Sequence, residues 1–220
     1  MKKGQIMIDS DAGSLIYKIA SQEDVVNILE LDTWNGMGTT QCVIQALKDT
    51  GKVANFISIE LYPEMYDEAV TNLASDLDYV KLLRGRIINQ DDFLGWMDHS
   101  TIDKNDPHAK LWYQKDFDYL GSAGDVSEAI QDEIDFLILD GGEYSTYPEW
   151  KKLEDKVKYV FLDDTRVLKT RKIRQELLDS GKYQVIEDVH DQRNGFACFK
   201  KIDNLNSAPY PPPPLPPVNP

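Results

Sequence analysis

Short apolar runs alternate with segments of helical periodicity along most of the chain. Seven runs predict strands, at residues 26–31, 54–61, 79–84, 134–139, 159–162, 183–189 and 195–200. Four segments predict helices, at residues 39–50, 63–75, 148–157 and 167–180, with Pro63 and Pro148 opening the second and third. Gly51 and Gly181 follow the first and last of these helices, where glycine commonly ends a helix.

This alternation predicts an α/β fold, a Rossmann-like doubly wound sheet with helices on both faces. The central runs are almost wholly apolar, as is typical of strands covered on both sides. The last two runs are joined by a short polar segment that contains Asn194 and Gly195. We therefore expect them to form an antiparallel hairpin at one edge of the sheet.

The predicted elements favour a single domain over residues 1–204, interrupted and followed by two unusual segments. Residues 86–133 form an insertion rich in aromatic residues, which is either a lid over a site or a contact in a homodimer. Residues 205–220 form a tail in which eight of the last twelve residues are proline. Such a tail adopts extended polyproline II structure, and it serves either as a spacer or as a ligand for a polyproline-binding partner.

Charge and composition exclude several classes of partner. The chain has 220 residues, with 38 acidic and 24 basic side chains and a net charge of −14. Such a surface repels phosphate backbones and anionic lipids, so we expect no nucleic-acid or membrane partner. The first residues show no signal peptide and the two cysteines, Cys42 and Cys198, are far apart, so we expect free thiols and a cytoplasmic location.

The loop after the first predicted strand has features of a nucleotide site. Gly36 and Gly38 precede the first predicted helix, whose N-terminus offers free N–H groups to a ligand. Glu60 ends the second strand, where an acid can accept the hydroxyls of a ribose. The dinucleotide pattern is incomplete because Gln41 stands at its third glycine. These residues predict a nucleoside-containing cofactor rather than a nicotinamide dinucleotide.

Aspartates follow the fourth and fifth predicted strands. Asp140 ends the fourth strand, and Asp163 and Asp164 end the fifth. In a parallel sheet these carboxylates emerge at the same edge as the glycine turn, where a hard divalent cation would offset their repulsion. Any one of these aspartates alone is explained as a turn residue or a helix cap, but all three together favour a site for Mg²⁺ or Mn²⁺.

Residues 30–40 resemble motif I of the class I S-adenosylmethionine-dependent methyltransferases, and are most similar to the small-molecule O-methyltransferases. The sequence departs from that motif at Asp32, where the family usually has glycine. The resemblance implies a seven-stranded sheet with the last strand antiparallel, and S-adenosylmethionine as cofactor. It further implies that the cofactor is bound by Glu30, Asp32, Thr33, Trp34, Asn35, Gly36, Gly38, Thr39, Glu60, Gly85 and Asp91.

The aspartate pattern also resembles that of metal-dependent sugar O-methyltransferases. This resemblance implies that Asp140, Asp163 and Asp164 hold the metal and that Asp140 is also the candidate base. Candidates for contact with substrate hydroxyls are Tyr144, Arg166 and His108, while His108 and His190 are rival bases. The tail and the compact layout are similar to those of glycan-tailoring methyltransferases encoded by large algal viruses, which implies a deoxysugar acceptor such as rhamnose in a glycan.

Three alternatives remain open at this point. A catechol-like or phenolic small molecule is a second acceptor class for the same fold. An NAD-dependent oxidoreductase or epimerase shares the turn and Glu60, although the chain lacks a Tyr-x-x-x-Lys pair near the fourth strand. A non-catalytic methyltransferase-like scaffold would bind a partner through the tail, and the substitution at Asp32 leaves that alternative open.

Overall fold

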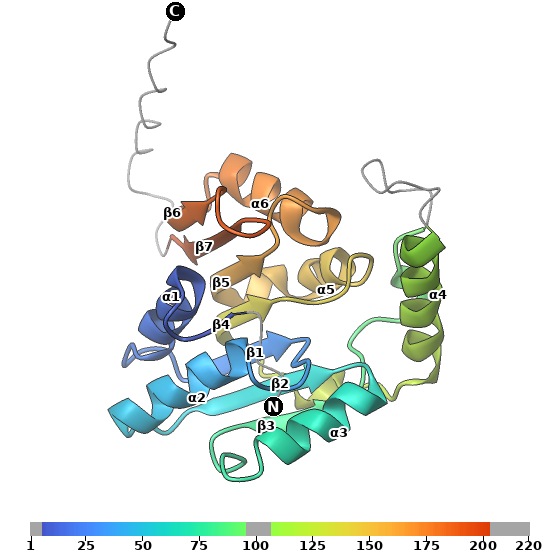
Figure 1. Cartoon of the computed structure of the whole chain (residues 1–220). Coiled ribbons are helices and arrows are strands. Elements are labelled where there is room, and N and C mark those ends of the chain that lie inside the picture. Colours follow the sequence, from blue (N-terminus) through green and yellow to red (C-terminus); the bar gives the residue numbers. More distant parts are fainter. Residues whose placement is uncertain (1–5, 96–106, 203–220) are drawn as a thin grey trace, which may run out of the picture.

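The computed structural model describes residues 6–95 and 107–202, which form one mixed sheet flanked by helices (Figure 1). The sheet has seven strands in the order β3-β2-β1-β4-β5-β7-β6. Its strands are β1 (Asn27–Leu31), β2 (Asn55–Glu60), β3 (Lys81–Arg84), β4 (Ile134–Leu139), β5 (Val157–Asp163), β6 (Tyr183–Val189) and β7 (Phe196–Lys201). Strands β1 to β5 are parallel, and β7 runs antiparallel to both β5 and β6. The predicted fold class is confirmed.

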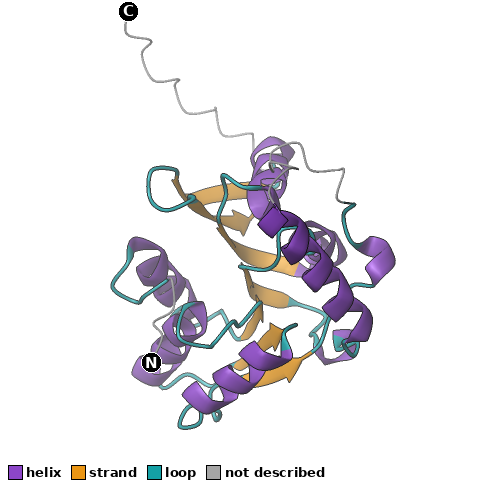
Figure 2. Cartoon of the chain, turned by 45° about the vertical axis from the view of Figure 1, so that its right-hand side comes forward, coloured by secondary structure: helices purple, strands orange, loops and turns teal. Residues whose placement is uncertain are grey.

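The helices lie on both faces of the sheet (Figures 1 and 2). They are α1 (Asp11–Ala20), α2 (Thr39–Thr50), α3 (Pro63–Asn72), α4 (Pro107–Ser122), α5 (Thr146–Leu153) and α6 (Leu168–Ser180). Helices α1 and α2 pack into one apolar core cluster, and α5 and α6 pack into a second cluster on the opposite face. The sheet is therefore buried on both sides, as its apolar strands predict.

Strand β4 shows how one apolar run serves both cores. Phe136 and Ile138 pack into the cluster beneath α1 and α2, whereas Leu137 and Leu139 pack into the cluster beneath α5 and α6. Successive side chains of a strand point to opposite faces, so a strand between two helical layers needs apolar residues at every position. All four side chains are fully buried.

The strand order reverses at β1, which lies between β2 and β4. The chain runs outward from β1 to β2 and β3, and then crosses back to place β4 on the other side of β1. The backbone N–H of Asp140, after β4, donates to the carbonyl oxygen of Leu31, at the end of β1 (3.4 Å). Ligands of open α/β sheets bind at such a switch point, beyond the carboxyl ends of the strands.

Three helices differ from the expectations, and one of them, α4, lies inside the insertion, where no helix was predicted. Helix α1 was not predicted, although Ala12, Leu15, Ile16 and Ile19 recur at helical spacing and are all buried. Its N-cap is Ser10, whose hydroxyl accepts the N–H of Gly13 (3.1 Å). Helix α5 begins at Thr146, two residues before Pro148. Proline is tolerated there because the first four N–H groups of a helix have no partner within the helix.

The hairpin of β6 and β7 was predicted, but its position in the sheet depends on tertiary packing. Strand β7 lies between β5 and β6, so β6 forms the edge. Gly195 precedes β7 with a φ of +82°, and Arg193 has a φ of +51°. The left-handed conformation of Gly195 lets the chain turn back toward β5.

Within its described residues, the long insertion supplies α4 and two short 3₁₀ segments, Gln90–Asp92 and Ser127–Ala129. Phe93, Tyr113 and Phe117 join Tyr144 in an aromatic cluster, with ring centroids 4.7–6.3 Å apart. The insertion is therefore packed onto the domain through α4. Residues 96–106 and the predicted tail at 205–220 lie outside the described residues. Whether the insertion is a lid or a dimer contact stays a prediction.

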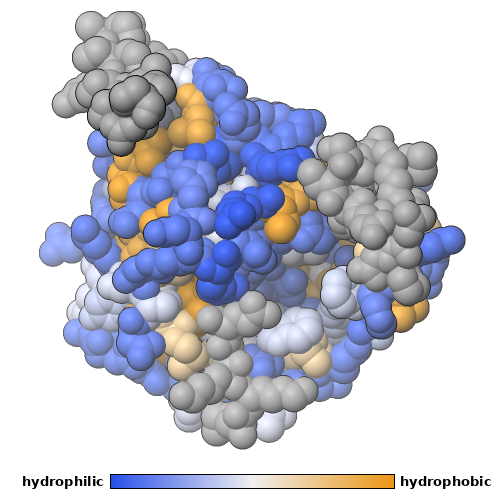
Figure 3. All heavy atoms as spheres, turned by 45° about the horizontal axis from the view of Figure 1, so that its top comes forward, coloured by the Kyte–Doolittle hydropathy of each residue, from blue (hydrophilic) through white to orange (hydrophobic). Residues whose placement is uncertain are grey.

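The surface is mainly polar over the face shown in Figure 3, with small apolar patches between the polar side chains. Large exposed apolar side chains occur singly or in pairs, as in Leu111 and Trp112 on α4, which are 63% and 64% exposed. Within the described ranges, no helix has the length and apolar character needed to span a bilayer.

Candidate active site

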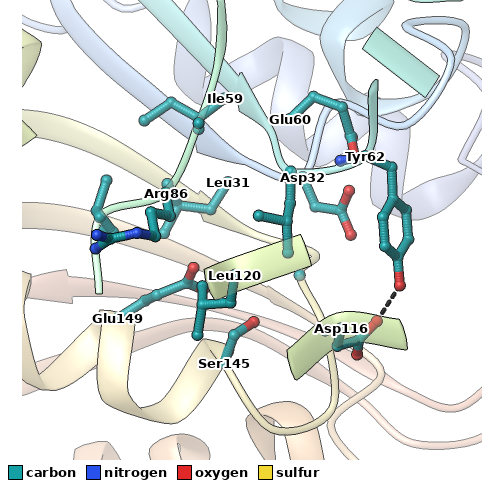
Figure 4. A pocket seen from close by; sticks show the side chains of 15 residues that line it. Leu31, Asp32, Ile59, Glu60, Tyr62, Arg86, Asp116, Leu120, Ser145 and Glu149 are labelled. Carbon is teal, nitrogen blue, oxygen red and sulfur yellow. Dashed lines mark hydrogen bonds between the residues drawn. The ribbon is translucent and has the colours of Figure 1, made fainter. Parts of the chain in front are cut away.

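Two hollows open at the carboxyl ends of the parallel strands and share Asp32 in their linings. The first is lined by residues that follow β1, β2, β3 and β4, together with residues of α4 and α5 (Figure 4). The second, of about 190 Å³, lies between the turn after β1 and the residues that follow β4 and β5. Both hollows lie where the reversal of strand order predicts a ligand site.

The turn after β1 has an unusual backbone at Asp32, whose φ is +76°. This left-handed conformation costs little for glycine but is strained for a residue with a Cβ. Trp34 and Gly36 also have positive φ values, of +52° and +76°. The motif that these residues resemble has glycine at position 32. The chain therefore keeps the glycine-like backbone of that motif and adds a carboxylate to it.

Glu60, the predicted ribose-binding acid, lines the first hollow although it is only 1% exposed. Its Oε2 accepts the N–H of Trp34 and its Oε1 accepts the N–H of Tyr62, both at 2.7 Å. Burial raises the pKa of Glu60 well above its ordinary value, and the neighbouring Asp32 raises it further. The carboxyl group is thus held at a fixed place, with lone pairs left to accept hydroxyl donors.

Glu30 has a different environment from the other predicted cofactor residues. Its carboxyl group is fully buried and accepts the hydroxyls of Thr39, Thr40 (2.7 Å) and Ser58 (2.5 Å). Burial raises its pKa to about 7. These bonds join β1 to β2 and to the first turn of α2. Glu30 lines neither hollow, and its contacts orient the turn instead.

The remaining predicted residues of the turn lie close together. Thr33, Trp34, Asn35, Gly38 and Thr39 all line the second hollow. Gly36 does not line this hollow. It packs against Leu73 instead, and a Cβ built on it would meet Leu73 Cδ1 at 2.7 Å. The tight packing beside Leu73 therefore explains this glycine.

The two predicted residues after β3 differ in placement. Gly85 lines the first hollow, and a Cβ built on it would meet Val126 Cγ1 at 2.5 Å and Gly124 O at 2.7 Å. Glycine is needed there because the insertion returns against this point. Asp91 is exposed on its 3₁₀ segment and is absent from the lining of both hollows.

The first hollow contains acids that the sequence did not indicate. Asp116 of α4 accepts the hydroxyl of Tyr62, and burial raises the pKa of Asp116 to about 6 (Figure 4). Glu149 of α5 is half-buried, and burial of its carboxyl group raises its pKa to about 8; its buried Oε2 has no hydrogen-bond partner among the described residues. No local motif indicates these acids, because α4 and α5 are distant in sequence from the turn after β1.

The three strand-end aspartates lie together, as predicted. Carboxylate oxygens of Asp140, Asp163 and Asp164 lie within 4.8 Å of one another. Their oxygens are ligands that Mg²⁺ and Mn²⁺ prefer. However, Lys169 Nζ lies 2.6 Å from Asp140 Oδ1 and 2.9 Å from Asp164 Oδ2. With this ammonium group among the carboxylates, the residues as arranged do not fit a divalent ion.

Charges inside the cluster act unequally on the aspartates. Asp163 is 2% exposed, and burial together with Asp140 raises its pKa to about 7, although Arg193 Nη2 lies 3.0 Å from its Oδ2. The pKa of Asp164 lies below its ordinary value. Burial alone would raise this pKa, but the nearby Lys169 ammonium group favours the ionised carboxylate. Lys169 itself keeps its proton, because these carboxylates raise its pKa more than burial lowers it.

The structure does not bring the predicted substrate residues to the hollows. Tyr144 is 2% exposed within the aromatic cluster, and its ring centroid lies 4.7 Å from that of Tyr113. Arg166 is exposed and donates to the carbonyl of His190 (3.4 Å), and His108 is exposed near the start of α4. Within the described part of the chain, none of them lines either hollow. Tyr144 is buried because aromatic side chains of the insertion cover it.

Comparison with known proteins shows which solved structures have a similar fold. No protein-family model matches the sequence, and no curated protein matches it. Among solved structures, one similar chain is a Staphylococcus aureus protein whose assignment as a caffeoyl-CoA O-methyltransferase is provisional (TM-score 0.58, 15% identity, covering 89% of this chain and 85% of that one). Another is an O-methyltransferase from Bacillus cereus in complex with S-adenosylhomocysteine (TM-score 0.56, 12% identity, 90% and 84% covered).

A third similar structure is a methyltransferase from Podospora anserina with bound S-adenosylhomocysteine (TM-score 0.55, 13% identity, 87% and 78% covered). At identities this low, the similarity supports a conclusion about the fold alone. The sheet order with its antiparallel β7, the turn after β1 and the buried acid at the end of β2 agree with that likeness. The chain has the fold of the class I S-adenosylmethionine-dependent methyltransferases.

Proposed function

We propose that this chain is an S-adenosylmethionine-dependent O-methyltransferase that acts on a sugar hydroxyl. The observation that carries the proposal is the sign of the charge around the two hollows. Their linings contain six carboxyl groups, of Asp32, Glu60, Asp116, Asp140, Glu149 and Asp164, and two basic groups, of Arg86 and Lys169. A sulfonium cofactor is positively charged, so an acidic hollow favours it.

The same charge disfavours the alternative of an NAD-dependent oxidoreductase or epimerase. A dinucleotide carries an anionic pyrophosphate, which usually lies against a glycine-rich turn and a helix N-terminus. In this chain the turn contains Asp32, and Asp140 and Asp164 line the same hollow. These carboxylates would repel a pyrophosphate at that place.

The placement of the residues supports a division of work between the two hollows. Glu60 is held by two backbone N–H groups in the first hollow, where it can accept ribose hydroxyls. Asp32 lines both hollows, at the point where the adenosine part of the cofactor would join its methionine part. Bound S-adenosylmethionine supplies an activated methyl group, and the chain's residues then have to orient the acceptor and remove its proton.

Asp140 is the best-placed base for the acceptor. Its side chain is 26% exposed and lines the second hollow, so an acceptor hydroxyl has access to it. Lys169 donates to both its Oδ1 and its carbonyl oxygen, at 2.6 and 3.2 Å, which fixes the carboxylate in one orientation. A carboxylate held within hydrogen-bond reach can take the proton of a hydroxyl as the methyl group is transferred.

Cofactor binding is the first test of the proposal. Calorimetric titration with S-adenosylmethionine, S-adenosylhomocysteine and NAD⁺ should show binding of the first two and none of the third. A Glu60→Gln variant should bind the cofactor more weakly, whereas Glu133→Gln, at an exposed position, should bind it as the unaltered chain does. Binding of NAD⁺ alone would refute the proposal.

The acceptor class needs a separate test. Release of S-adenosylhomocysteine should be measured with a panel of monosaccharides, including deoxysugars such as rhamnose, and with catechols. The proposal expects turnover with a sugar. Turnover with catechols alone would assign the chain to phenolic acceptors. If the cofactor binds but no acceptor in the panel is methylated, the scaffold alternative is favoured.

A further inference from the structure

Lys169 lies inside the cluster of strand-end aspartates. Its Nζ is 2.6 Å from Asp140 Oδ1, 3.2 Å from the carbonyl oxygen of Asp140 and 2.9 Å from Asp164 Oδ2. An ammonium group has three protons, and these three oxygens can accept all of them. The side chain of Lys169 is only 7% exposed, so the group is a buried part of the site.

The backbone holds this lysine in position as well. Lys169 is the second residue of α6, and its N–H donates to Glu143 Oε2 (3.0 Å), in the loop after β4. The next residue, Thr170, donates its hydroxyl to the carbonyl oxygen of Asp163 (2.7 Å). The first turn of α6 is thus tied to the ends of both β4 and β5, and the lysine side chain has little freedom to leave the cluster.

The charges in the cluster come close to balance without an added ion. Asp140, Asp163 and Asp164 contribute three carboxyl groups. The single positive charge of Lys169 contacts two of them, and Arg193 Nη2 lies 3.0 Å from the third, Asp163 Oδ2. Carboxylates that converge in a fold must be offset by cations, and here two side chains of the same chain do this.

A divalent cation would compete with Lys169 for the same oxygens. Mg²⁺ requires oxygen ligands at about 2.0–2.1 Å in octahedral geometry. An ion bound to Asp140 Oδ1 and Asp164 Oδ2 would lie beside the ammonium group that already contacts both atoms. Two cations at that spacing repel each other strongly in a buried site. The cluster therefore accommodates one of them at a time.

We propose that the Lys169 ammonium is the resident cation of this cluster, and that it positions Asp140 without a divalent metal. In this arrangement Lys169 is a positioning residue, because its protons are directed to the protein's own carboxylates. The inference rests on the proposed methyl transfer only for the role of Asp140. Its central claim, that Lys169 excludes a metal, is tested by metal binding, independently of turnover.

The first experiment is a titration of the chelator-treated full chain with Mn²⁺, followed through the electron paramagnetic resonance signal of the free ion. The unaltered chain should leave that signal unchanged. Lys169→Met should bind Mn²⁺ at least about tenfold more tightly, since the three aspartates lose their main counter-charge. Lys169→Arg should restore the exclusion of Mn²⁺ because it keeps the positive charge.

The matched control is Lys172→Met on the same helix. Lys172 is exposed and lies over the ring of Tyr147, 3.9 Å from its centroid, so the variant changes the net charge equally without touching the cluster. It should bind Mn²⁺ no better than the unaltered chain. A gain equal to that of Lys169→Met would show a general charge effect and overturn the proposal.

Methyl transfer supplies an independent readout. If the chain is active, S-adenosylhomocysteine release should persist in excess chelator and should not rise on addition of Mg²⁺ or Mn²⁺. Loss of release in chelator with recovery on Mn²⁺ would overturn the proposal. Circular dichroism checks that Lys169→Met folds. If that variant is unfolded, titration of the unaltered chain decides, because tight Mn²⁺ binding overturns the proposal and its absence supports it.

Discussion

The carboxyl groups of Asp32 and Glu60 interact with each other where the neighbouring strands β1 and β2 end. Burial raises the pKa of both groups, and the charge of Asp32 adds to the effect on Glu60. Two adjoining carboxyls of this kind hold a shared proton most readily at low pH. The pair lies where the two hollows meet, so its ionisation changes the charge that a bound cofactor meets.

This pair makes cofactor preference depend on pH. Raised pKa values mean that the carboxyls are neutral in acid and become negative as the pH rises. The sulfonium of S-adenosylmethionine gains from that negative charge, and the neutral sulfur of S-adenosylhomocysteine does not. The ratio of the two dissociation constants should therefore shift toward S-adenosylmethionine as the pH rises from about 5 to about 8. Calorimetric titration at several pH values measures it, and a flat ratio would contradict the prediction.

Replacement of Asp32 should separate stability from binding. Asp32→Gly places glycine at a φ of +76° and removes a carboxyl group whose buried Oδ1 has no hydrogen-bond partner among the described residues. We expect the free energy of unfolding to rise by about 1 kcal/mol. The preference for S-adenosylmethionine over S-adenosylhomocysteine should fall, because a negative charge is lost. Urea unfolding and calorimetry check the two effects, and an equal loss of affinity for both ligands would argue against a role at the sulfonium.

Glu60→Gln should weaken cofactor binding by weakening the contact with the ribose. At a pH where Glu60 is ionised, a hydrogen bond to its carboxylate contributes about 1.5–3 kcal/mol, so affinity should fall roughly 10- to 100-fold. The effect should largely vanish with an analogue of S-adenosylhomocysteine that lacks the ribose hydroxyls. The exposed Glu133→Gln variant is the control. If the variant loses the same factor with the analogue, Glu60 acts through the fold and not through the ribose.

Asp140→Asn should reduce turnover with little change in cofactor affinity. Asparagine keeps the shape and still accepts from Lys169 but cannot take a proton, and loss of a general base costs about 10²–10⁴-fold in kcat. Steady-state release of S-adenosylhomocysteine measures kcat, and calorimetry measures binding. Asp132→Asn, fully exposed, serves as the control. Full activity in Asp140→Asn would assign the base elsewhere.

Glu149 should make the stability of the protein fall with rising pH. Burial raises its pKa to about 8, against an ordinary value of 4.5, so between these values the folded state holds a proton that the unfolded state releases. The stabilising effect of that proton is complete in acid and is lost as the pH rises through about 8. Glu149→Gln cannot ionise, so relative to the unaltered chain it should gain about 1–3 kcal/mol between about pH 5 and about pH 8.5. Urea unfolding at both pH values tests this, and a constant difference would contradict it.

The strands and the turn after β1 could be predicted because their signals are local. An apolar run such as residues 136–139 of β4 indicates a strand covered on both sides. The positions of Gly36, Gly38 and Glu60 indicate a turn and an acid at the same edge of the sheet. Since parallel strands end at one edge, the convergence of Asp140, Asp163 and Asp164 followed from their places in sequence.

Local signals misled where tertiary packing decides what a side chain contacts. Tyr144 lies in the loop after β4, yet the insertion covers it with Phe93 and Tyr113. Glu30 belongs to the motif but is enclosed by three hydroxyls. The aromatic partners of Tyr144 and the Ser58 partner of Glu30 are distant in sequence, so the residues next to each side chain do not reveal its full environment.

The sequence by itself determined the order of the elements, the burial of the strands and the edge where a ligand would bind, because periodicity and strand direction are properties of short segments. Only the tertiary structure decided which charges share that edge. Asp140 and Lys169 are 29 residues apart, and they meet because β4 and β5 pair in parallel and α6 begins where β5 ends. Short-range attraction between ions depends on such distances, which the linear order of residues does not contain.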